Sequence, residues 1–450
     1  MRTQIMVLAV STLAFPASAA TLSSLTSWSG SSGYVFGPPM VAAATGDIYG
    51  VLGFGTTSAS GSVYSLTPSG SSWTQNTISS FSGGSGGGAP VGGLAAGASG
   101  DLYGAAFSGG SSSSACKSAG LSGCGLIYQL APPTGGFTWT RSTLYTFTGG
   151  TDGIGPVGGL IADSTGALYG VTANGGCTPT LTYPVGCGIV FKLTPPGAGK
   201  TNWTETVLYR FQGGSADGAY PMAPLAMDSA GDLYGATEYG GAENCTTLSG
   251  TPDGRCGTVF KLTNNAGTYT ESVLHIFADG TDGSIAGGGV VLDKAGNVYG
   301  TALQGGSDTG LCLNFGYSGC GQVFELVKPK TGSVWKKKAL LNFSGKDGAT
   351  PATLVIDGKG RLYGVTSRNT TADTSCGVSY YCGTIFKLAK VDKVWTETVL
   401  YGFTGAGSVA DPEFGLSVDA SGNVYGVTEY DVTSTAFLLA GSGFRPPLRR

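Results

Sequence analysis

Four aspartates recur every 65 residues and are the clearest candidates for chemistry: Asp152, Asp217, Asp282 and Asp347. Each is followed by glycine, in segments such as DGTDGSIA (from Asp279). Symmetry would set the four aspartates in an arc around the mouth of a central channel, where a set of carboxylates can bind a cation or a polar ligand such as a sugar. Asp-Gly also shapes tight turns, because the carboxylate accepts local N–H groups and glycine adopts conformations that other residues resist. We favour the turn-forming role and keep ligand binding as the alternative.

Residues that differ between repeats are better binding candidates, because the fold does not require them. They occur where the second strand-like segment of each repeat ends: Asn174, Glu238 with Tyr239, Gln304, Arg368, and Glu429 with Tyr430. A cleft lined by such residues would combine aromatic platforms with hydrogen-bonding groups, as binding sites usually do. The alternative role of each is that of a solvated loop residue.

Catalysis has little support in the residue types present. The single histidine, His275, occupies the position that tyrosine holds in neighbouring VLYxF segments, and a lone histidine excludes repeated His-based triads or metal sites. A carboxylate pair as in glycosidases stays open, because Glu238, Glu429 and the four aspartates would share one face. No glycine-rich phosphate loop opens a helix. We therefore expect no cofactor, and leave open whether a cation is bound.

Ten cysteines form five regularly placed pairs, and each second member starts an apolar segment such as CGTVFKL (from Cys256). The repetition predicts five disulfides inside corresponding loops: Cys116/Cys124, Cys177/Cys187, Cys245/Cys256, Cys312/Cys320 and Cys376/Cys382. A metal or redox site is the alternative, but the chain contains no CxxC motif.

A repeat of about 65 residues must position these groups. A Leu, Ile or Val followed by Tyr-Gly occurs seven times, with tyrosines at 49, 103, 169, 234, 299, 363 and 425. Each repeat holds four short segments rich in Val, Tyr, Phe, Trp and Thr, which are strand signals. In the third repeat these are GLIAD, ALYGVT, GIVFKL and WTETVLYRF. Asp163 and Gly166 bound the turn between the first two, a type I signature.

Four antiparallel strands per repeat, seven times over, predict an all-β fold: a seven-bladed β-propeller. The last repeat lacks a fourth strand, so we expect the N-terminal segment 21–28 to complete that blade and close the ring. We expect small residues in the innermost strands. One propeller domain should span residues 21–440, with blades at 37–81, 89–147, 156–211, 221–277, 286–343, 351–403, and 412–440 plus 21–28.

The terminal segments and the charge balance of the chain indicate where the protein is located and which partners it can bind. Residues 1–20 combine Arg2, an apolar stretch and Ala17-Ser18-Ala19, the pattern of a secretory signal peptide. No later segment predicts a membrane span. The chain carries 24 basic and 27 acidic residues, a net charge of −3, so nothing in its overall balance suggests nucleic-acid binding. We expect a secreted monomer with a short tail at 441–450.

The recurring pattern DxxGxLYGxTxxGG, CGxVFKL and WTETVLYxF resembles the GloVer tandem repeat of secreted bacterial choice-of-anchor proteins, over residues 37 to about 430. The resemblance implies export and a repeat-built domain, often followed by a variable sorting anchor, but it implies no established activity. The ending GSGFRPPLRR holds no hydrophobic anchor, so we expect release or periplasmic residence.

Two functions follow as hypotheses. The first is a non-catalytic propeller that binds a glycan or an extracellular protein through the face that carries the cysteine loops. The second is a secreted carbohydrate-active hydrolase or lyase that uses carboxylates on that face.

Overall fold

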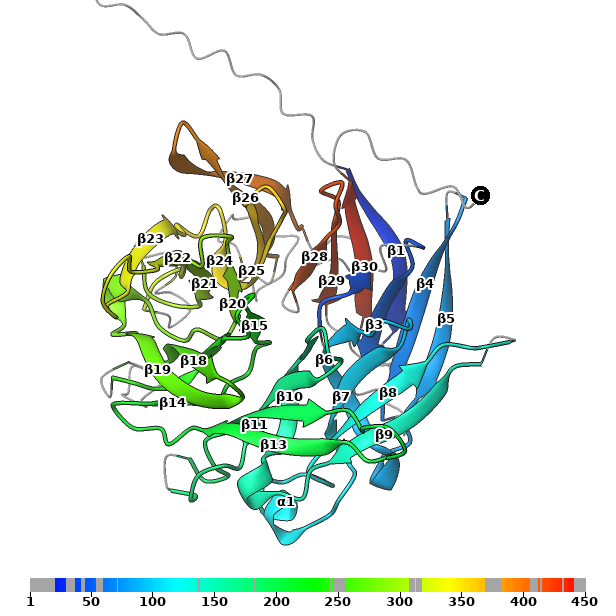
Figure 1. Ribbon diagram of the computed structural model, residues 1–450. Helices are drawn as coiled ribbons and strands as arrows, with labels where there is room; N and C mark the ends of the chain where they lie inside the picture. Colours follow the sequence, from blue (N-terminus) through cyan, green and yellow to red (C-terminus); the bar gives the residue numbers. More distant parts are fainter. Residues whose placement is uncertain are drawn as a thin grey trace, which may run out of the picture.

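The computed structural model is a ring of seven small β-sheets (Figure 1). The structure describes residues 21–29, 37–41, 45–53, 60–70, 72–135, 138–180, 183–242, 245, 256–306, 312, 318–368, 382–404, 412, 415–430 and 433–440. The predicted signal peptide and the C-terminal tail lie outside these residues.

Each sheet is a blade of four antiparallel strands, and in blades 1 to 6 the order of the strands follows the chain. Blade 1 holds β2 (Met40–Val41), β3 (Ile48–Leu52), β4 (Ser62–Ser69) and β5 (Ser72–Ser80). Blade 2 holds β6 (Gly88–Ala96), β7 (Leu102–Ser108), β8 (Leu126–Ala131) and β9 (Thr140–Thr146). Blade 3 holds β10 (Ile154–Ala162), β11 (Leu168–Asn174), β12 (Ile189–Thr194) and β13 (Thr204–Arg210).

The second half of the ring repeats this arrangement. Blade 4 holds β15 (Ala226–Met227), β16 (Leu233–Thr237), β18 (Thr258–Asn265) and β19 (Thr268–Ile276), with an extra pair β14 (Gly218–Ala219) and β17 (Tyr239–Gly240). Blade 5 holds β20 (Val290–Leu292), β21 (Val298–Ala302), β22 (Gln322–Val327) and β23 (Lys336–Asn342). Blade 6 holds β24 (Ala349–Ile356), β25 (Leu362–Arg368), β26 (Thr384–Val391) and β27 (Val394–Gly402).

The seventh blade joins the two ends of the chain, as predicted. It consists of β28 (Leu416–Val418), β29 (Val424–Tyr430), β30 (Thr433–Ala440) and the N-terminal strand β1 (Thr21–Ser29). β1 pairs antiparallel with β30, with Trp28 opposite Ser434. The Trp28 side chain is 4% exposed, and its ring lies 4.6 Å from that of Tyr64 in blade 1. β1 therefore both completes blade 7 and contacts the first blade.

Aromatic rings pack between successive blades and account for two of the recurring motifs. The phenylalanine that ends each VLYxF segment packs edge-on against the aromatic ring of the third strand in the next blade, as in Phe211 with Phe260 at 5.0 Å. That third-strand ring lies over the glycine of the Tyr-Gly motif: a Cβ atom at Gly235 would come within 2.4 Å of the Phe260 ring. Both rings are fully buried, which stabilises the fold by about 2–3 kcal/mol per side chain.

The innermost strands carry small residues because they approach one another around the axis, as expected. A Cβ atom at Gly92 would lie 2.1 Å from the backbone nitrogen of Gly159, and one at Gly158 would lie 2.5 Å from Ala223. The same proximity joins the last blade to the first, since a Cβ atom at Gly415 would lie 3.5 Å from Pro38. A larger side chain at these glycines would displace a neighbouring blade.

Candidate functional site

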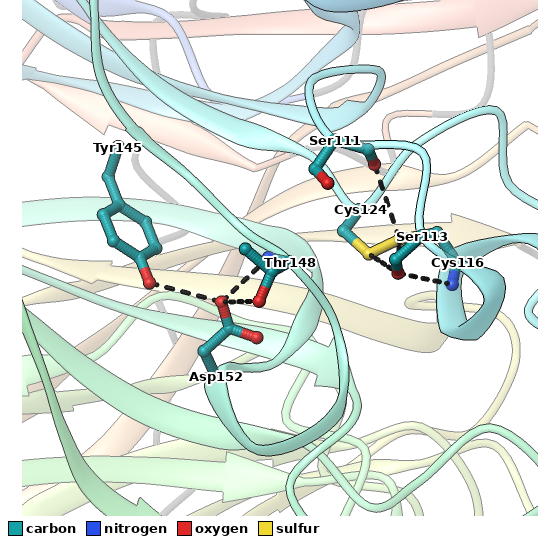
Figure 2. Close-up of a disulfide and its surroundings, with 7 residues drawn as sticks. All are labelled: Ser111, Ser113, Cys116, Cys124, Tyr145, Thr148 and Asp152. Carbon is teal, nitrogen blue, oxygen red and sulfur yellow. Dashed lines mark hydrogen bonds between the residues drawn. A yellow bond between two sulfur atoms is a disulfide. The ribbon is translucent and has the colours of Figure 1, made fainter.

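In blades 2 to 5, a disulfide within the blade closes the loop between the second and third strands. The bonds are Cys116–Cys124, Cys177–Cys187, Cys245–Cys256 and Cys312–Cys320. Figure 2 shows the first of them, next to the short helix α1 (Ser114–Ser118), where the Ser113 hydroxyl lies 3.0 Å from the Cys116 sulfur. These four pairs confirm the predicted connectivity.

The structure describes only one member of the predicted fifth pair, Cys376/Cys382. Cys382 is fully buried and disulfide-bonded, and it precedes β26 by two residues, as Cys187 precedes β12. Cys376 lies outside the described residues. Cys382 therefore has the position and the chemical state expected of a second cysteine, whereas its pairing with Cys376 stays a prediction.

The second cysteine of each pair also connects its blade to the next one. The Cys187 carbonyl accepts a hydrogen bond from the backbone N–H of Tyr220 at 2.9 Å, and Cys124, Cys256 and Cys320 accept equivalent bonds at 2.9 Å. The glycine that follows accommodates a proline of the next blade: a Cβ atom at Gly188 would come within 2.5 Å of Pro221. The Cys-Gly motif therefore ends a disulfide-closed loop, starts a strand and attaches the neighbouring blade.

The disulfide loops and the blade-to-blade connections lie on one side of the ring, which we call the loop face. Backbone hydrogen bonds join them directly, from Gly176 to Gly150 and from Gly241 to Gly214, both at 2.8 Å. The opposite side, which carries the turns between first and second strands and the hairpins between third and fourth strands, is the turn face. All the sequence-predicted binding candidates belong to segments of the loop face.

The four recurring aspartates lie near the outer rim of the loop face, not at the channel mouth where we expected them. The carboxylate of Asp152 accepts hydrogen bonds from the Tyr145 hydroxyl on the outermost strand β9, at 3.2 Å, and from the N–H and hydroxyl of Thr148, at 2.8 and 2.9 Å (Figure 2). Each connection starts at an outermost strand, and the aspartate, although it comes late in the connection, bonds back to the residues at its start. These bonds within one turn agree with the turn-forming role.

The same arrangement recurs at the other three aspartates. Asp217 accepts from the Tyr209 hydroxyl at 3.0 Å, and Asp282 bonds to the His275 ring nitrogen at 3.0 Å. His275 thus takes the structural role of the tyrosine that it replaces. Asp347 accepts from the N–H and hydroxyl of Ser344, at 2.8 and 2.9 Å.

Three of these aspartates lie near a glutamate on the outermost strand of the following blade, and the pKa of that glutamate is raised. Burial, and secondarily the negative charge of Asp152, raise the pKa of Glu205 to about 7. Glu271 next to Asp217 and Glu397 next to Asp347 have pKa values of about 7 for the same two reasons. We did not identify these glutamates from the sequence, although each is the third residue of a recurring segment, WTETVLY in blades 3 and 6 and YTESVLH in blade 4.

Lysine replaces the glutamate in blade 5. The Lys337 ammonium lies 3.0 Å from the Asp282 carboxylate, and it also donates to Gln322 at 2.7 Å. Burial alone would raise the pKa of Asp282, but the hydrogen bond from His275 and the charges of His275 and Lys337 hold it below its ordinary value. We call the contact between such an aspartate and the outermost strand of the following blade a seam. The seam at blade 5 holds an ion pair, whereas the seams at blades 3, 4 and 6 each hold two acidic groups.

The aspartates of the turns between first and second strands are structural, as predicted. Asp163 accepts from the N–H groups of Thr165 and Ala167, at 2.8 and 3.1 Å, and from the Tyr169 hydroxyl at 2.9 Å. The tyrosine of the Tyr-Gly motif is thereby fixed to its own turn.

The repeat-breaking candidates divide by burial. Asn174 and Gln304 are 7% and 3% exposed, so both side chains belong largely to the interior. Glu238, Tyr239 and Arg368 are partly exposed at the ends of second strands. Glu429 and Tyr430 are in β29, and their side chains lie outside the described part of the structure.

Three tyrosines gather on the loop face around one of these candidates. The Tyr239 ring lies 5.0 Å from that of Tyr220 and 6.4 Å from that of Tyr183. Glu238 precedes Tyr239, and its backbone N–H donates to the Tyr220 carbonyl at 3.1 Å. Met222, which is 36% exposed, follows Tyr220 by two residues. We predicted only Glu238 and Tyr239; Tyr220 comes from the start of blade 4 and Tyr183 from the disulfide loop of blade 3.

The backbone of Tyr220 is held in a left-handed conformation, with φ of 57°. Ala89, Gly155, Ile285 and Thr350 occupy the same place in other blades and also have positive φ. This conformation is unfavourable for a bulky residue, and the inter-blade hydrogen bond to the cysteine carbonyl holds the backbone in it. Because the backbone N–H makes that bond, the side chain is free to vary at this position in the repeat.

Among the described residues, no three His, Cys, Asp or Glu side chains are placed to share a metal ion. Within the same residues, no helix is sufficiently long and apolar to span a bilayer. The four disulfides fit an extracellular or periplasmic protein, because such bonds persist in oxidising compartments.

Solved structures of similar shape include a putative 6-phosphogluconolactonase from Bacteroides uniformis, with 12% identity, a TM-score of 0.47, and coverage of 80% of this chain and 82% of that one. AofleA from Arthrobotrys oligospora has 12% identity, a TM-score of 0.41, and coverage of 85% and 90%. An α-L-arabinofuranosidase from Fusarium graminearum has 14% identity, a TM-score of 0.42, and coverage of 74% and 88%. Likeness at this level transfers no function.

Comparison with curated proteins found no match. The model of the Gloeobacter/Verrucomicrobia repeat matches residues 35–309 and 244–439, which together include all seven Tyr-Gly motifs. These matches agree with the resemblance seen in the repeated motifs. The chain belongs to the Gloeobacter/Verrucomicrobia repeat family.

Proposed function

We propose that the protein is a non-catalytic extracellular binding propeller that recognises a glycan on its loop face. The proposed site is the tyrosine cluster, in which the partly exposed Tyr220 and Tyr239 are the ligand-facing rings and the buried Tyr183, 6% exposed, supports Tyr239, together with Glu238. Aromatic rings provide platforms for the apolar faces of sugar rings, and a carboxylate accepts hydrogen bonds from sugar hydroxyl groups.

The observation that carries this proposal is that blade 4 brings together two tyrosines, Tyr220 and Tyr239, from different segments of the loop face. The place of Tyr220 is taken by alanine, glycine, isoleucine or threonine in the other described blades that show this left-handed position. The place of Tyr239 is taken by Ser108, Asn174, Gln304 and Arg368 in repeats 2, 3, 5 and 6, and by the aromatic residues Phe54 and Tyr430 in repeats 1 and 7. Neither ring is needed to build a blade, yet in blade 4 they pack 5.0 Å apart and stay partly exposed.

The left-handed backbone at Tyr220 is a feature of the repeat, since Ile285 and Thr350 also have positive φ at this place. A glycine avoids the conformational cost of φ of 57°, as Gly155 does in blade 3, so Tyr220→Gly removes the ring without straining the backbone.

The test is a glycan array with the purified chain, followed by calorimetric titration of the best ligand. Tyr220→Gly should weaken binding at least about tenfold, the loss of one aromatic contact. Glycine suits this backbone, so Tm should not fall. Ala89→Gly is the matched control at the same place in blade 2, and it should leave binding unchanged. Full affinity in both Tyr220→Gly and Tyr239→Ala would overturn the proposed site.

Turnover distinguishes this function from the hydrolase or lyase alternative. The same polysaccharides should be incubated with the chain and with Glu238→Gln, and reducing ends and unsaturated products measured. We expect saturable binding without product. Product formation that disappears in Glu238→Gln would replace the binding function with a catalytic one.

A further inference from the structure

Charge is distributed unevenly around the ring. Residues 321–393, which form the outer part of blade 5 and the first three strands of blade 6, contain 12 basic and 5 acidic residues, a net charge of +7. The remaining 12 basic and 22 acidic residues give the rest of the chain a net charge of −10. A local excess of this size attracts anionic partners, although the whole chain is slightly acidic.

Exposed apolar side chains concentrate in the same two blades. Five large hydrophobic residues are exposed in the described part of the chain, and four of them are valines of blades 5 and 6. They are Val334, at 76%, Val391, at 55%, Val394, at 66%, and Val399, at 44%. Scattered exposed valines need no explanation, but four in one basic region do.

Two of these valines lie side by side at the tip of the β26–β27 hairpin. Asp392 and Lys393 form its two-residue turn, with φ of 48° and 69°, and Val391 pairs with Val394 across it. Paired residues lie on one face of a hairpin. Trp395 lies on the other face, because side chains alternate along a strand. Its ring packs 5.9 Å from that of Tyr299 in blade 5, so the two valines face away from that blade.

Lysines lie on the turn face on the other side of this tip from the two valines. Lys390 pairs with Trp395 across the hairpin, so it lies on the face toward blade 5, with its ammonium 4.7 Å from the centre of the Trp395 ring. In blade 5, Lys328 starts the neighbouring hairpin, and its N–H donates to Asn297 in the turn that also carries Lys294, at 3.0 Å. Lys294, Lys328 and Lys390 are exposed, as is Lys393 at the tip itself. In Figure 1 the β26–β27 hairpin extends away from the centre of the ring.

We propose that this surface, the basic-valine patch of Lys294, Lys328, Lys390, Lys393, Val391 and Val394, docks the protein on an anionic lipid bilayer. Lysines attract the negative headgroups of such a surface. The valines at the projecting tip enter the interface between headgroups and acyl chains. A soluble acidic polymer would use the lysines but has no apolar layer to receive the valines. The patch lies on the face opposite the tyrosine cluster, which leaves that cluster accessible to a ligand.

Sedimentation with vesicles tests the proposal. The purified chain is mixed with vesicles of phosphatidylcholine containing 30 mol% phosphatidylglycerol, and with vesicles of phosphatidylcholine alone, at low and high salt. We expect binding to the anionic vesicles that weakens with salt. The double variant Lys390→Glu/Lys393→Glu should reduce the partition coefficient at least about tenfold. The control Lys117→Glu/Lys200→Glu makes the same change in net charge in blades 2 and 3, and should have a much smaller effect.

Val391→Ser/Val394→Ser separates a bilayer from an acidic polymer, since it keeps every charge. It should weaken binding to anionic vesicles several-fold and leave any binding to soluble polygalacturonate unchanged. Vesicle binding that depends on the lysines but not on the valines would overturn docking on a bilayer, as would binding to polygalacturonate alone. Absence of binding to anionic vesicles at low salt would overturn it as well.

Discussion

The Lys337 ammonium contacts the Asp282 carboxylate at 3.0 Å, at the seam where blades 3, 4 and 6 place a glutamate near the corresponding aspartate. The lysine is 9% exposed, and its neighbour Gln322 accepts a further hydrogen bond at 2.7 Å. The seams therefore share one geometry, but the two charged groups attract each other in blade 5 and repel each other in blades 3, 4 and 6. Two of our predictions test this difference.

Lys337→Glu should destabilise the protein, because it replaces an attractive pair in a largely buried seam by two acidic groups. We expect a loss on the order of 2 kcal/mol in the free energy of unfolding at pH 8. The loss should shrink near pH 5, where the new glutamate can hold a proton. Denaturant unfolding at both pH values measures it. Lys336→Glu is the control, since that lysine is exposed; an equal loss in both variants would contradict the role of the seam.

Glu205, Glu271 and Glu397 should make the protein more stable in mild acid than at neutral pH. Burial and a nearby aspartate raise the pKa of each from 4.5 to about 7. Between these pH values the folded state keeps protons that the unfolded state releases, so their contribution is full below pH 4.5 and is lost as the pH rises through about 7.

The glutamine variants isolate this effect. Glu271→Gln should raise Tm above pH 7 by on the order of 1–2 °C and flatten its pH dependence between 4.5 and 7. Asp392→Asn removes an exposed negative charge in a hairpin turn and should leave the slope unchanged. An unaltered slope in the triple glutamine variant would show that the glutamates titrate alike in folded and unfolded chains.

Gly235→Ala should cost about 1–3 kcal/mol of stability, because the added methyl would come within 2.4 Å of the Phe260 ring. Combining it with Phe260→Leu should cost less than the sum of the two single changes, since leucine leaves room for the methyl. Gly402→Ala is the control, as no other atom lies within 4 Å of its added Cβ. Additive losses in chemical denaturation would argue against direct contact.

Trp28→Ala should destabilise the closed ring by about 3–5 kcal/mol, the cost of removing a fully packed large side chain. Removing residues 21–29 should have a larger effect, because β30 then loses its outer partner as well. Ser23→Ala, at an exposed position of the same strand, should be nearly neutral. Thermal unfolding measures all three, and an unchanged Tm after the deletion would contradict closure by β1.

The repeat made the fold predictable, because spacing, strand alternation and turn residues all agree. The position of the Asp152 carboxylate was not predictable in the same way. Its spacing is equally compatible with a position near the axis or near the rim, and only the path of the connection from β9 decides between them. The hydrogen bond to Tyr145 then fixes the carboxylate at the rim.

The tyrosine cluster was half predictable for a related reason. Tyr239 ends a recognisable strand, so its departure from the repeat was visible. Tyr220 occupies a place where five described blades carry five different residues, so no pattern marks it. Only the inter-blade hydrogen bond from its N–H to Cys187 shows that these residues share one conformation.

Because β1 pairs with β30, the ring can close only after the last strand has been synthesised. The first segment of the folded domain to leave the ribosome finds its partner only when the last has been made. Until then the nascent chain keeps an unsatisfied strand at each end, open to proteases and to other unfinished copies. Any fragment that stops short of residue 433 lacks this closing step, so only the completed domain should resist proteolysis.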